Sequence, residues 1–148
     1  MQLKWPLKHI FITQGFGVNP KIYAQFGMKG HDGLDLRTRW YDSPLARMEV
    51  KAAADGVVFD VQWAKTGYGY HVRIRHADGS ITIYGHLSVI KVSKNQIVKC
   101  GQVIGISGNT GFSSGSHLHF EYRPQGWEKM TGNGYAGAIN PLPLLPKL

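Results

Sequence analysis

Hydrophobic and polar residues alternate along several short runs of this chain, and turns rich in glycine separate the runs. Alternation with a period of two, in segments rich in β-branched and aromatic residues, is typical of β-strands. No long segment repeats apolar residues at helical spacing, so we expect helices to be few and short. The strands predicted from this pattern are 57–63, 70–76, 80–86, 102–107 and 118–123.

Turn signals indicate how these strands are connected. The Asp78-Gly79 pair favours a tight hairpin, which would make the second and third predicted strands antiparallel neighbours. The proline-rich segment 140–146 cannot form the interior of a helix and is expected to lie extended on the domain. The predicted fold class is therefore mainly β, with an antiparallel sheet as its core.

Length and composition are those of a globular protein. The 148 residues are 43% hydrophobic, and neither a linker nor a repeat interrupts them, so we predict a single domain spanning 1–148. No run approaches ~18 consecutive apolar residues, so no membrane span is expected, and the first residues lack the apolar stretch of a secretory signal peptide. The lone Cys100 excludes an internal disulfide and is interpreted as a small buried residue rather than a nucleophile.

The chain is basic, with 17 Lys and Arg against 9 Asp and Glu and a formal net charge of +8. This balance favours an anionic partner, although a basic surface that only confers solubility explains it equally well. The charges are dispersed, and the chain has neither a basic block nor an aromatic stacking motif, so no specific nucleic-acid partner is expected.

Imidazole and carboxylate groups occur together in two distant segments. The first contains His31 and Asp35 and the second contains His117 and His119, a set of ligand types that suits zinc. Residues two apart on a strand share a face but are separated by ~6.5 Å, which suits one metal ligand beside one catalytic group. A site with two histidines and one carboxylate leaves the fourth position of zinc open for water, as catalysis requires. Glu121 continues the same face and is expected to orient a ligand imidazole.

A hydrolase also needs groups that accept and donate protons. The chain lacks the His-Glu-x-x-His motif, so His86 and His117 are the candidate acid–base pair, with their individual roles left open. The other histidines have a simpler interpretation: His9 as a surface or hydrogen-bonded residue, and His71 and His76 on a solvated strand face beside arginines. Asp32 is interpreted as a turn residue ahead of Gly33. A structural zinc site is disfavoured because such sites usually use several cysteines.

Several motifs, in order along the chain, resemble the lysostaphin-type zinc endopeptidases that hydrolyse peptidoglycan peptides. The resemblance runs from about residue 30 to residue 123, and motifs that keep their order and spacing are far more specific than any one alone. The segments that carry it are Gly30-His31-Asp32-Gly33-Leu34-Asp35-Leu36, 50–58, 67–76, Tyr84-Gly85-His86-Leu87-Ser88, 98–105, Gly108-Asn109-Thr110-Gly111 and His117-Leu118-His119-Phe120-Glu121.

The resemblance implies one Zn²⁺ per chain, held by His31, Asp35 and His119, with His86 and His117 as the catalytic pair. It also implies an antiparallel β core with a substrate groove walled by loops. Among the motif residues, Tyr84 and Asn109 are expected to contact the substrate. One departure concerns the loop after Gly15-Phe16-Gly17, where family members often carry an arginine and this chain has Val18-Asn19-Pro20.

The predicted function is that of a zinc endopeptidase acting on peptide bonds of bacterial peptidoglycan, in the cross-bridge or the stem peptide. Glycine bridges and D-alanyl-diaminopimelate cross-links both remain open as substrates. A monomer that acts on the wall outside the cytoplasm is expected. A bare catalytic unit without a signal peptide suggests an antimicrobial phage lysin or tail component, or a domain cut from a larger secreted protein. The alternative is a catalytically inactive wall-binding or regulatory module of the same fold. A biotinyl-carrier-like fold is disfavoured because the chain lacks the carrier lysine motif.

Overall fold

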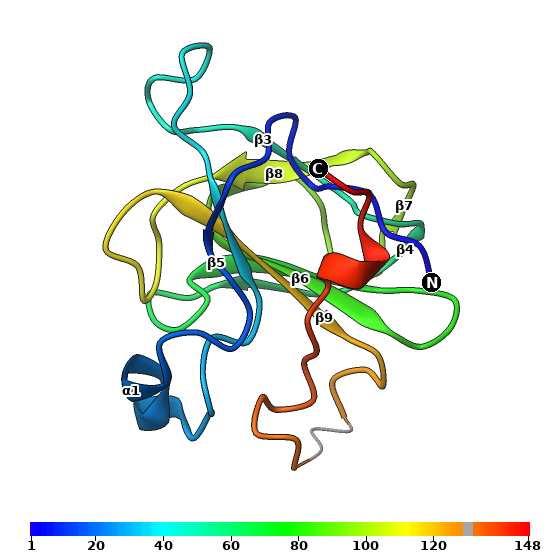
Figure 1. Ribbon diagram of the computed structural model, residues 1–148. Helices are drawn as coiled ribbons and strands as arrows, with labels where there is room; N and C mark the ends of the chain where they lie inside the picture. Colours follow the sequence, from blue (N-terminus) through cyan, green and yellow to red (C-terminus); the bar gives the residue numbers. More distant parts are fainter. Residues whose placement is uncertain (129–131) are drawn as a thin grey trace.

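The chain forms one antiparallel sheet of nine strands in a computed structural model, which describes residues 1–128 and 132–148 (Figure 1). The strand order is β1-β2-β9-β6-β5-β4-β7, while β8 pairs with both β3 and β6. The prediction of a mainly β fold with an antiparallel core is confirmed. The strands are β1 (Ile12–Gln14), β2 (Leu34–Arg37), β3 (Glu49–Lys51), β4 (Gly56–Trp63), β5 (Tyr70–Arg75), β6 (Ile81–Ile90), β7 (Ile97–Val98), β8 (Val103–Ser107) and β9 (His117–Arg123).

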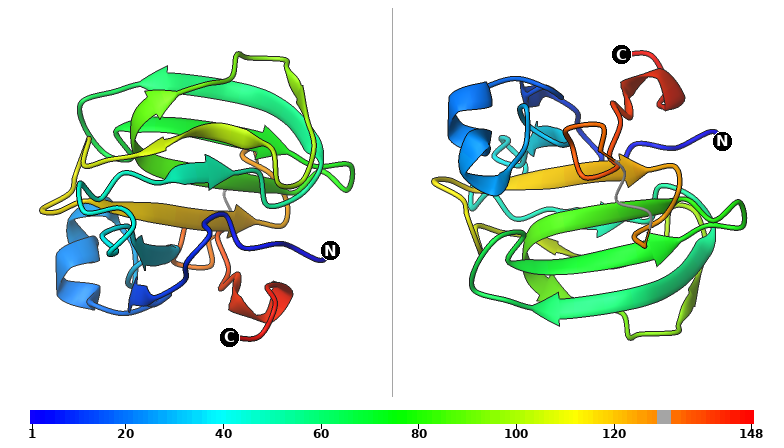
Figure 2. Two further views of the ribbon diagram at one scale, coloured as in Figure 1. Left: turned by 90° about the horizontal axis from the view of Figure 1, so that it is seen from above. Right: turned by 90° about the horizontal axis from the view of Figure 1, so that it is seen from below.

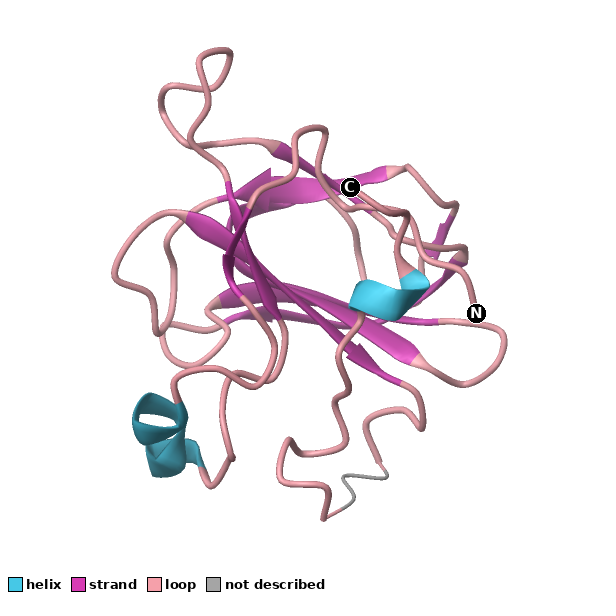
Figure 3. Cartoon of the chain, in the orientation of Figure 1, coloured by secondary structure: helices cyan, strands magenta, loops and turns pink. Residues whose placement is uncertain are grey.

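Helical segments are short, as the absence of helical periodicity predicts (Figure 3). They are α1 (Pro20–Tyr23), followed directly by the 3-10 turn η1 (Ala24–Phe26), and a second 3-10 turn, η2 (Leu142–Leu144). Within the described residues, no helix is both long and apolar enough to cross a membrane.

The longest strand, β6, joins the two parts of the sheet. Its first half, from Ile81 to Gly85, pairs with β9, and its second half, from Leu87 to Ile90, pairs with β8. The ribbon views show the sheet curving so that β3 and β8 lie across from β6 and β9 (Figures 1 and 2). Fully buried aliphatic and aromatic side chains fill the space between these parts, because every second residue of each strand points inward. They include Val50, Val58, Ile74, Leu87, Ile104, Leu118 and Phe120.

A bulge in β6 lets the strand continue past its predicted end. Tyr70 pairs with Leu87 and Val72 pairs with Tyr84, so β6 holds one more residue than β5 across this interval. The extra residue falls at Gly85-His86, and His86 has a positive φ of 61°. A bulge of this kind redirects a side chain and bends the strand. The strands that the sequence pattern did not predict are β1, β2, β3 and β7, with two to four residues each, too short to show alternation.

The end of the chain packs on the sheet as expected, although it contains η2 rather than being extended throughout. The amide of Leu3 donates to the carbonyl of Leu144 at 2.9 Å, and the indole of Trp5 donates to the carbonyl of Pro146 at 3.0 Å. Leu145 is buried among the core residues. N- and C-terminal segments therefore lie side by side (Figure 1).

Three local predictions are wrong. Cys100 is exposed rather than buried, because it lies in the tight turn after β7. His71 and His76 are buried, not solvated. Their Nδ1 atoms bond to the carbonyls of Gly69 and Asp55. His76 Nε2 also has a partner, Thr82, whereas His71 Nε2 has none in the described residues.

Candidate active site

The pairing of β2 with β9 sets the positions of the predicted ligands. Asp35 lies opposite His119 in this antiparallel pair. Alternation along β9 turns Leu118 into the core and His119 to the other face. The turn before β2 carries His31 back over β9. This close approach requires a glycine at position 33. A Cβ there would lie 2.5 Å from the carbonyl oxygen of Phe120 and 2.9 Å from the His119 ring.

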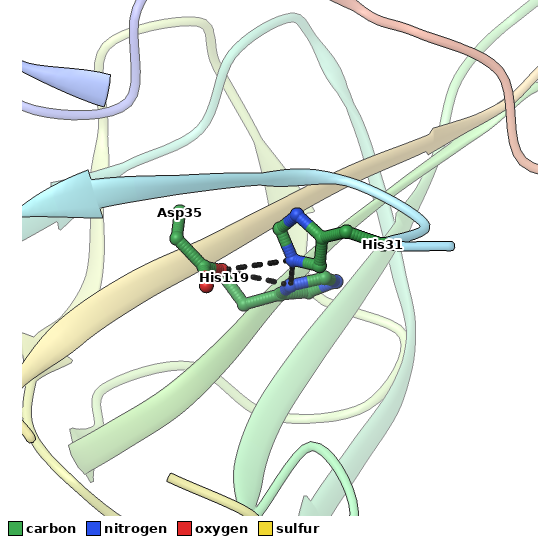
Figure 4. A group of neighbouring side chains, drawn as sticks. All are labelled: His31, Asp35 and His119. Atoms are coloured by element: carbon green, nitrogen blue, oxygen red, sulfur yellow. Dashed lines mark hydrogen bonds and ion pairs between the residues drawn. The ribbon is translucent and has the colours of Figure 1, made fainter. Parts of the chain in front are cut away.

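Three atoms from these residues form a nearly equilateral triangle (Figure 4). His31 Nε2 lies 3.1 Å from His119 Nδ1 and 3.1 Å from Asp35 Oδ1, and the third side, from His119 Nδ1 to Asp35 Oδ1, is 3.2 Å. All three residues are buried. With zinc–ligand distances near 2.0–2.1 Å, the ligands of a tetrahedral site are roughly 3.3 Å apart. The triangle therefore has the donor types and the size of one face of a zinc site.

Hydrogen bonds to the opposite ring nitrogens determine which nitrogen of each ligand imidazole is free. His31 donates its Nδ1–H to the carbonyl of Gly15 at 2.9 Å, and His119 donates its Nε2–H to Glu121 Oε1 at 3.2 Å. A carbonyl oxygen and an ionised carboxylate can only accept a hydrogen bond, so each ring must be the donor. The lone pairs of His31 Nε2 and His119 Nδ1 therefore both point into the triangle. Gln14 donates to the second oxygen of Asp35 at 2.9 Å and fixes that carboxylate as well.

His86 and His117 stand beside the triangle. Their ring centroids are 4.7 Å apart, and His117 Nε2 lies 3.4 Å from Asp35 Oδ1. Each ring donates its Nδ1–H to a backbone carbonyl, of Thr110 at 2.6 Å and of Gly115 at 2.8 Å, so each keeps a free Nε2. Burial lowers the pKa of His86 to about 3, with help from the neighbouring imidazoles, so its ring is neutral and can accept a proton.

A buried polar network supports His119 from behind. Glu121 accepts from His119 at 3.2 Å, from the Tyr68 phenol at 2.7 Å and from Arg123 Nε at 2.5 Å. Burial alone would raise the pKa of Glu121, but the His119 hydrogen bond and the Arg123 charge hold it at about 2. Asp32 lies next to this network, and burial together with the Glu121 charge raises its pKa to about 7. Glu121 is therefore a fixed anion that orients the His119 ring.

The ligand triangle and the two further histidines line the floor of a groove of about 900 Å³. One wall comes from α1 and η1 and includes Ile22, Tyr23 and Phe26, and the facing wall is the loop 111–116. Rings of Phe26 and Phe112 meet edge to face across it, with centroids 5.2 Å apart. The site thus combines a triangle of candidate metal ligands, two further imidazoles and room for an extended chain.

Comparison with known proteins identifies the family. The family model described as peptidase family M23 matches residues 29–131. The chain belongs to peptidase family M23. Its resemblance to lysostaphin-type enzymes is also seen in three dimensions: the lysostaphin catalytic domain from Staphylococcus simulans superposes with a TM-score of 0.71 at 28% identity, over 90% of each chain.

Curated relatives of this M23 chain carry different functional names. The DD-carboxypeptidase/endopeptidase Mpg of Neisseria meningitidis is 40% identical over 119 residues, which cover 76% of this chain and 27% of the relative. The murein hydrolase activator NlpD of Salmonella typhimurium is 33% identical over 129 residues, which cover 86% of this chain and 30% of the relative. The chain thus spans less than a third of the length of these relatives, and the family includes both hydrolases and activators.

The structure brings together His31, Asp35, His86, His117 and His119, the five residues to which the M23 resemblance assigns roles. It does not place both expected substrate contacts in the groove. Tyr84 is fully buried and its hydroxyl bonds to the amide of Ala53 and to Thr82, so the prediction that it contacts substrate is wrong. Asn109 is exposed and accepts from Ser113, outside the residues that line the groove.

Sequence reasoning missed four supporting residues: Gln14, Asp32, Tyr68 and Arg123. Alternation along β9 could have indicated Arg123, which follows His117, His119 and Glu121 on the same face. Gln14, Asp32 and Tyr68 come from separate loops and strands, and no local pattern in the sequence connects them to His119.

Proposed function

We propose that this chain is a zinc-dependent endopeptidase that hydrolyses peptide bonds of bacterial peptidoglycan, in the cross-bridge or the stem peptide. In this proposal His31, Asp35 and His119 hold one zinc ion, and His86 and His117 are the acid–base pair. The observation that carries it is the convergence of four imidazoles and one carboxylate, with one nitrogen of every ring tied to an acceptor and the other facing the groove.

The chemistry that zinc supplies when bound is that of a Lewis acid, which makes water more acidic and polarises a peptide carbonyl. The protein's own groups then handle the protons. His86 is held neutral, so its Nε2 can take a proton from the attacking water. His117 presents its Nε2 on the other side of the same space and can stabilise developing negative charge or protonate the leaving amine.

Substrate class and place of action follow the family. The name of Mpg, DD-carboxypeptidase/endopeptidase, supports peptide bonds of the wall as the substrate. A wall is anionic, and the net charge of +8 would favour the approach of this chain to it. We therefore place its action at the bacterial cell wall, outside the cytoplasm, as a lytic and antimicrobial enzyme that works as a monomer.

A second candidate is a regulatory or wall-binding module without turnover. The observation that favours it is the similarity to NlpD, which is named an activator of murein hydrolases. Both candidates use the same fold, so sequence similarity does not separate them. The complete set of five side chains in one groove favours the enzyme.

A digest of purified walls separates the two candidates. The zinc-loaded protein is incubated with walls from bacteria with glycine bridges and with direct diaminopimelate cross-links, and the released peptides are identified by mass spectrometry. We expect new amino termini with the wild type and none with His86→Ala. Wall binding without any released peptide, for the wild type on both wall types, would favour the regulatory module instead.

A further inference from the structure

Two arginines extend the groove beyond the ligand triangle. Arg37 and Arg39 both line it, and both are exposed. Arg37 is two residues after Asp35 on β2 and pairs in register with His117. It therefore shares the face of Asp35, and about 6.7 Å of strand separates the two Cα atoms. The extended backbone of one peptide residue spans at most ~3.6 Å, so this end of the groove lies within two residues of the ligand triangle.

Arg37 is held in place before any substrate binds. Its Nε donates to the carbonyl of Arg39 at 2.7 Å, and its guanidinium carbon lies 4.8 Å from the centre of the Trp40 ring. Trp40 is fixed in turn, because its indole donates to the carbonyl of Arg37 at 3.2 Å. Arg39 donates through Nη1 to the carbonyl of Pro44. These contacts order Arg37 while leaving its two terminal amino groups available.

Within the part of the chain that the structure describes, no carboxylate neutralises the positive charge of this pair. In residues 1–128 and 132–148, neither guanidinium forms an ion pair, and the carbonyls that they contact carry no net charge. Asp42, the only carboxylate in the loop 38–47, pairs with Lys8 and His9 instead. Arg123, the remaining arginine of the groove, is already paired with the buried Glu121. The charge is therefore available to a ligand.

We propose that Arg37 and Arg39 form a subsite for a free carboxylate on the residue that follows the bond to be cleaved. A peptide backbone offers an α-carboxylate near a scissile bond only on the amine side, and a guanidinium binds such a group through paired N–H donors. A D-alanyl-diaminopimelate bond meets this requirement, since the carbon that bears the leaving nitrogen also bears a carboxylate. The interior of a glycine bridge carries no charge. This inference rests on the proposed peptidase function and selects its substrate class.

Hydrolysis of two synthetic peptides tests the subsite. They share one sequence and differ only in the residue after the scissile D-alanyl bond, which ends in a free carboxylate in one peptide and in a carboxamide in the other. We expect the wild type to prefer the carboxylate in kcat/KM by about tenfold, the typical effect of one charge-assisted hydrogen bond. Arg37→Gln should remove most of this preference and Arg37→Lys should keep part of it. Equal rates on both peptides in the wild type would overturn the proposal.

Arg47→Gln is the matched control, because Arg47 is exposed on the same loop but does not line the groove. It removes one positive charge and should leave the preference unchanged. A preference that falls equally in Arg47→Gln and Arg37→Gln would show a diffuse effect of net charge and would contradict a subsite.

Equilibrium binding keeps this test separate from the proposed function. The affinities of both peptides are measured by calorimetry on zinc-loaded His86→Ala and on the double variant His86→Ala/Arg37→Gln. If the wild type cleaves neither peptide, the peptidase proposal fails, while tighter binding of the carboxylate that Arg37→Gln abolishes still supports the subsite. Equal affinities for the two peptides would overturn the subsite even if both were cleaved.

Discussion

The histidines at the groove and His76, which is buried near the end of β5, differ in what their ring nitrogens are left to do. At the groove, His31, His86, His117 and His119 each donate one N–H to a carbonyl or carboxylate. The second nitrogen faces the groove or another atom of the ligand triangle. Near the end of β5, both nitrogens of His76 have partners within the fold: the carbonyl of Asp55 at 2.7 Å and the hydroxyl of Thr82 at 2.9 Å.

The chain of hydrogen bonds from His76 is closed. Thr82 continues to the Tyr84 hydroxyl at 2.8 Å, and that hydroxyl accepts from the amide of Ala53 at 2.9 Å. Burial alone therefore does not mark a functional histidine. An uncommitted nitrogen is not sufficient either, because within the described residues the buried His71 also keeps a free Nε2, away from the groove. What distinguishes the groove is that the free nitrogens of four rings lie together there, where they can meet a cation, a proton or a substrate.

The largest expected difference between the groove histidines and His76 is in metal content. His31→Ala and His119→Ala each remove a ligand of a three-residue site, so we expect almost all zinc to be lost. His76→Ala should retain one zinc per chain, although it is expected to be less stable. Elemental analysis of the folded proteins measures this, and full retention of zinc in both ligand variants would refute the ligand assignment.

A second expected difference lies in turnover without loss of metal. His86→Ala and His117→Ala should keep zinc and lower kcat by at least ~100-fold, the low end for general acid–base catalysis. The partly exposed His9, which lies outside the groove and pairs with Asp42, supplies the control His9→Ala. If His117→Ala instead lost its zinc, the roles of His117 and His119 would be reversed.

Removing the charge of Glu121, which orients the His119 ring, should have a smaller effect, on the affinity for zinc. Glu121→Gln replaces the anion that orients the His119 ring, and outer partners of this kind typically change metal affinity by ~10–100-fold. The control is Glu128→Gln, which alters an exposed carboxylate that pairs with Arg75. Competition with a chelator of known affinity gives the zinc dissociation constants. Equal constants for the two variants would show that Glu121 has no part in holding the metal.

The smallest expected effect is that of His76 on the free energy of unfolding at acid pH. Burial lowers the pKa of His76 below its usual 6.5, against the opposing charges of Asp78 and Asp55. Below pH 6.5 the unfolded chain then binds a proton that the folded chain does not. The free energy of unfolding therefore decreases as the pH is lowered, by at most about 1.4 kcal/mol per pH unit. Denaturant titrations at pH 7.5 and 5.5 should show a smaller loss for His76→Gln than for the wild type. An equal loss would mean that His76 does not contribute.

Several features of the site followed from local sequence patterns. Alternation in 118–123 placed His119 and Glu121 on one face, and the structure joins their side chains by a hydrogen bond. The Asp78-Gly79 turn correctly paired β5 with β6. The motif order identified the M23 family, because spacing along the chain is itself sequence information. A strand of period two needs no tertiary information to assign a face.

Other features depended on segments that are distant along the chain. The role of Asp32 was missed, because its burial beside Glu121 arises only when the turn before β2 packs on β9. Tyr84 was misassigned, since the direction of its side chain depends on how β6 lies against the core.

The sequence by itself determined the strand faces, the family and the residue types of the candidate site, because these depend on local periodicity and on ordered motifs. Only the tertiary structure decided which nitrogen of each imidazole is free, that His86 turns into the groove at a bulge, and that Arg37 and Arg39 have no carboxylate partner in the described residues. The physical reason is that hydrogen-bond partners and neutralising charges come from segments far apart in the chain. Folding, not sequence proximity, sets their distances.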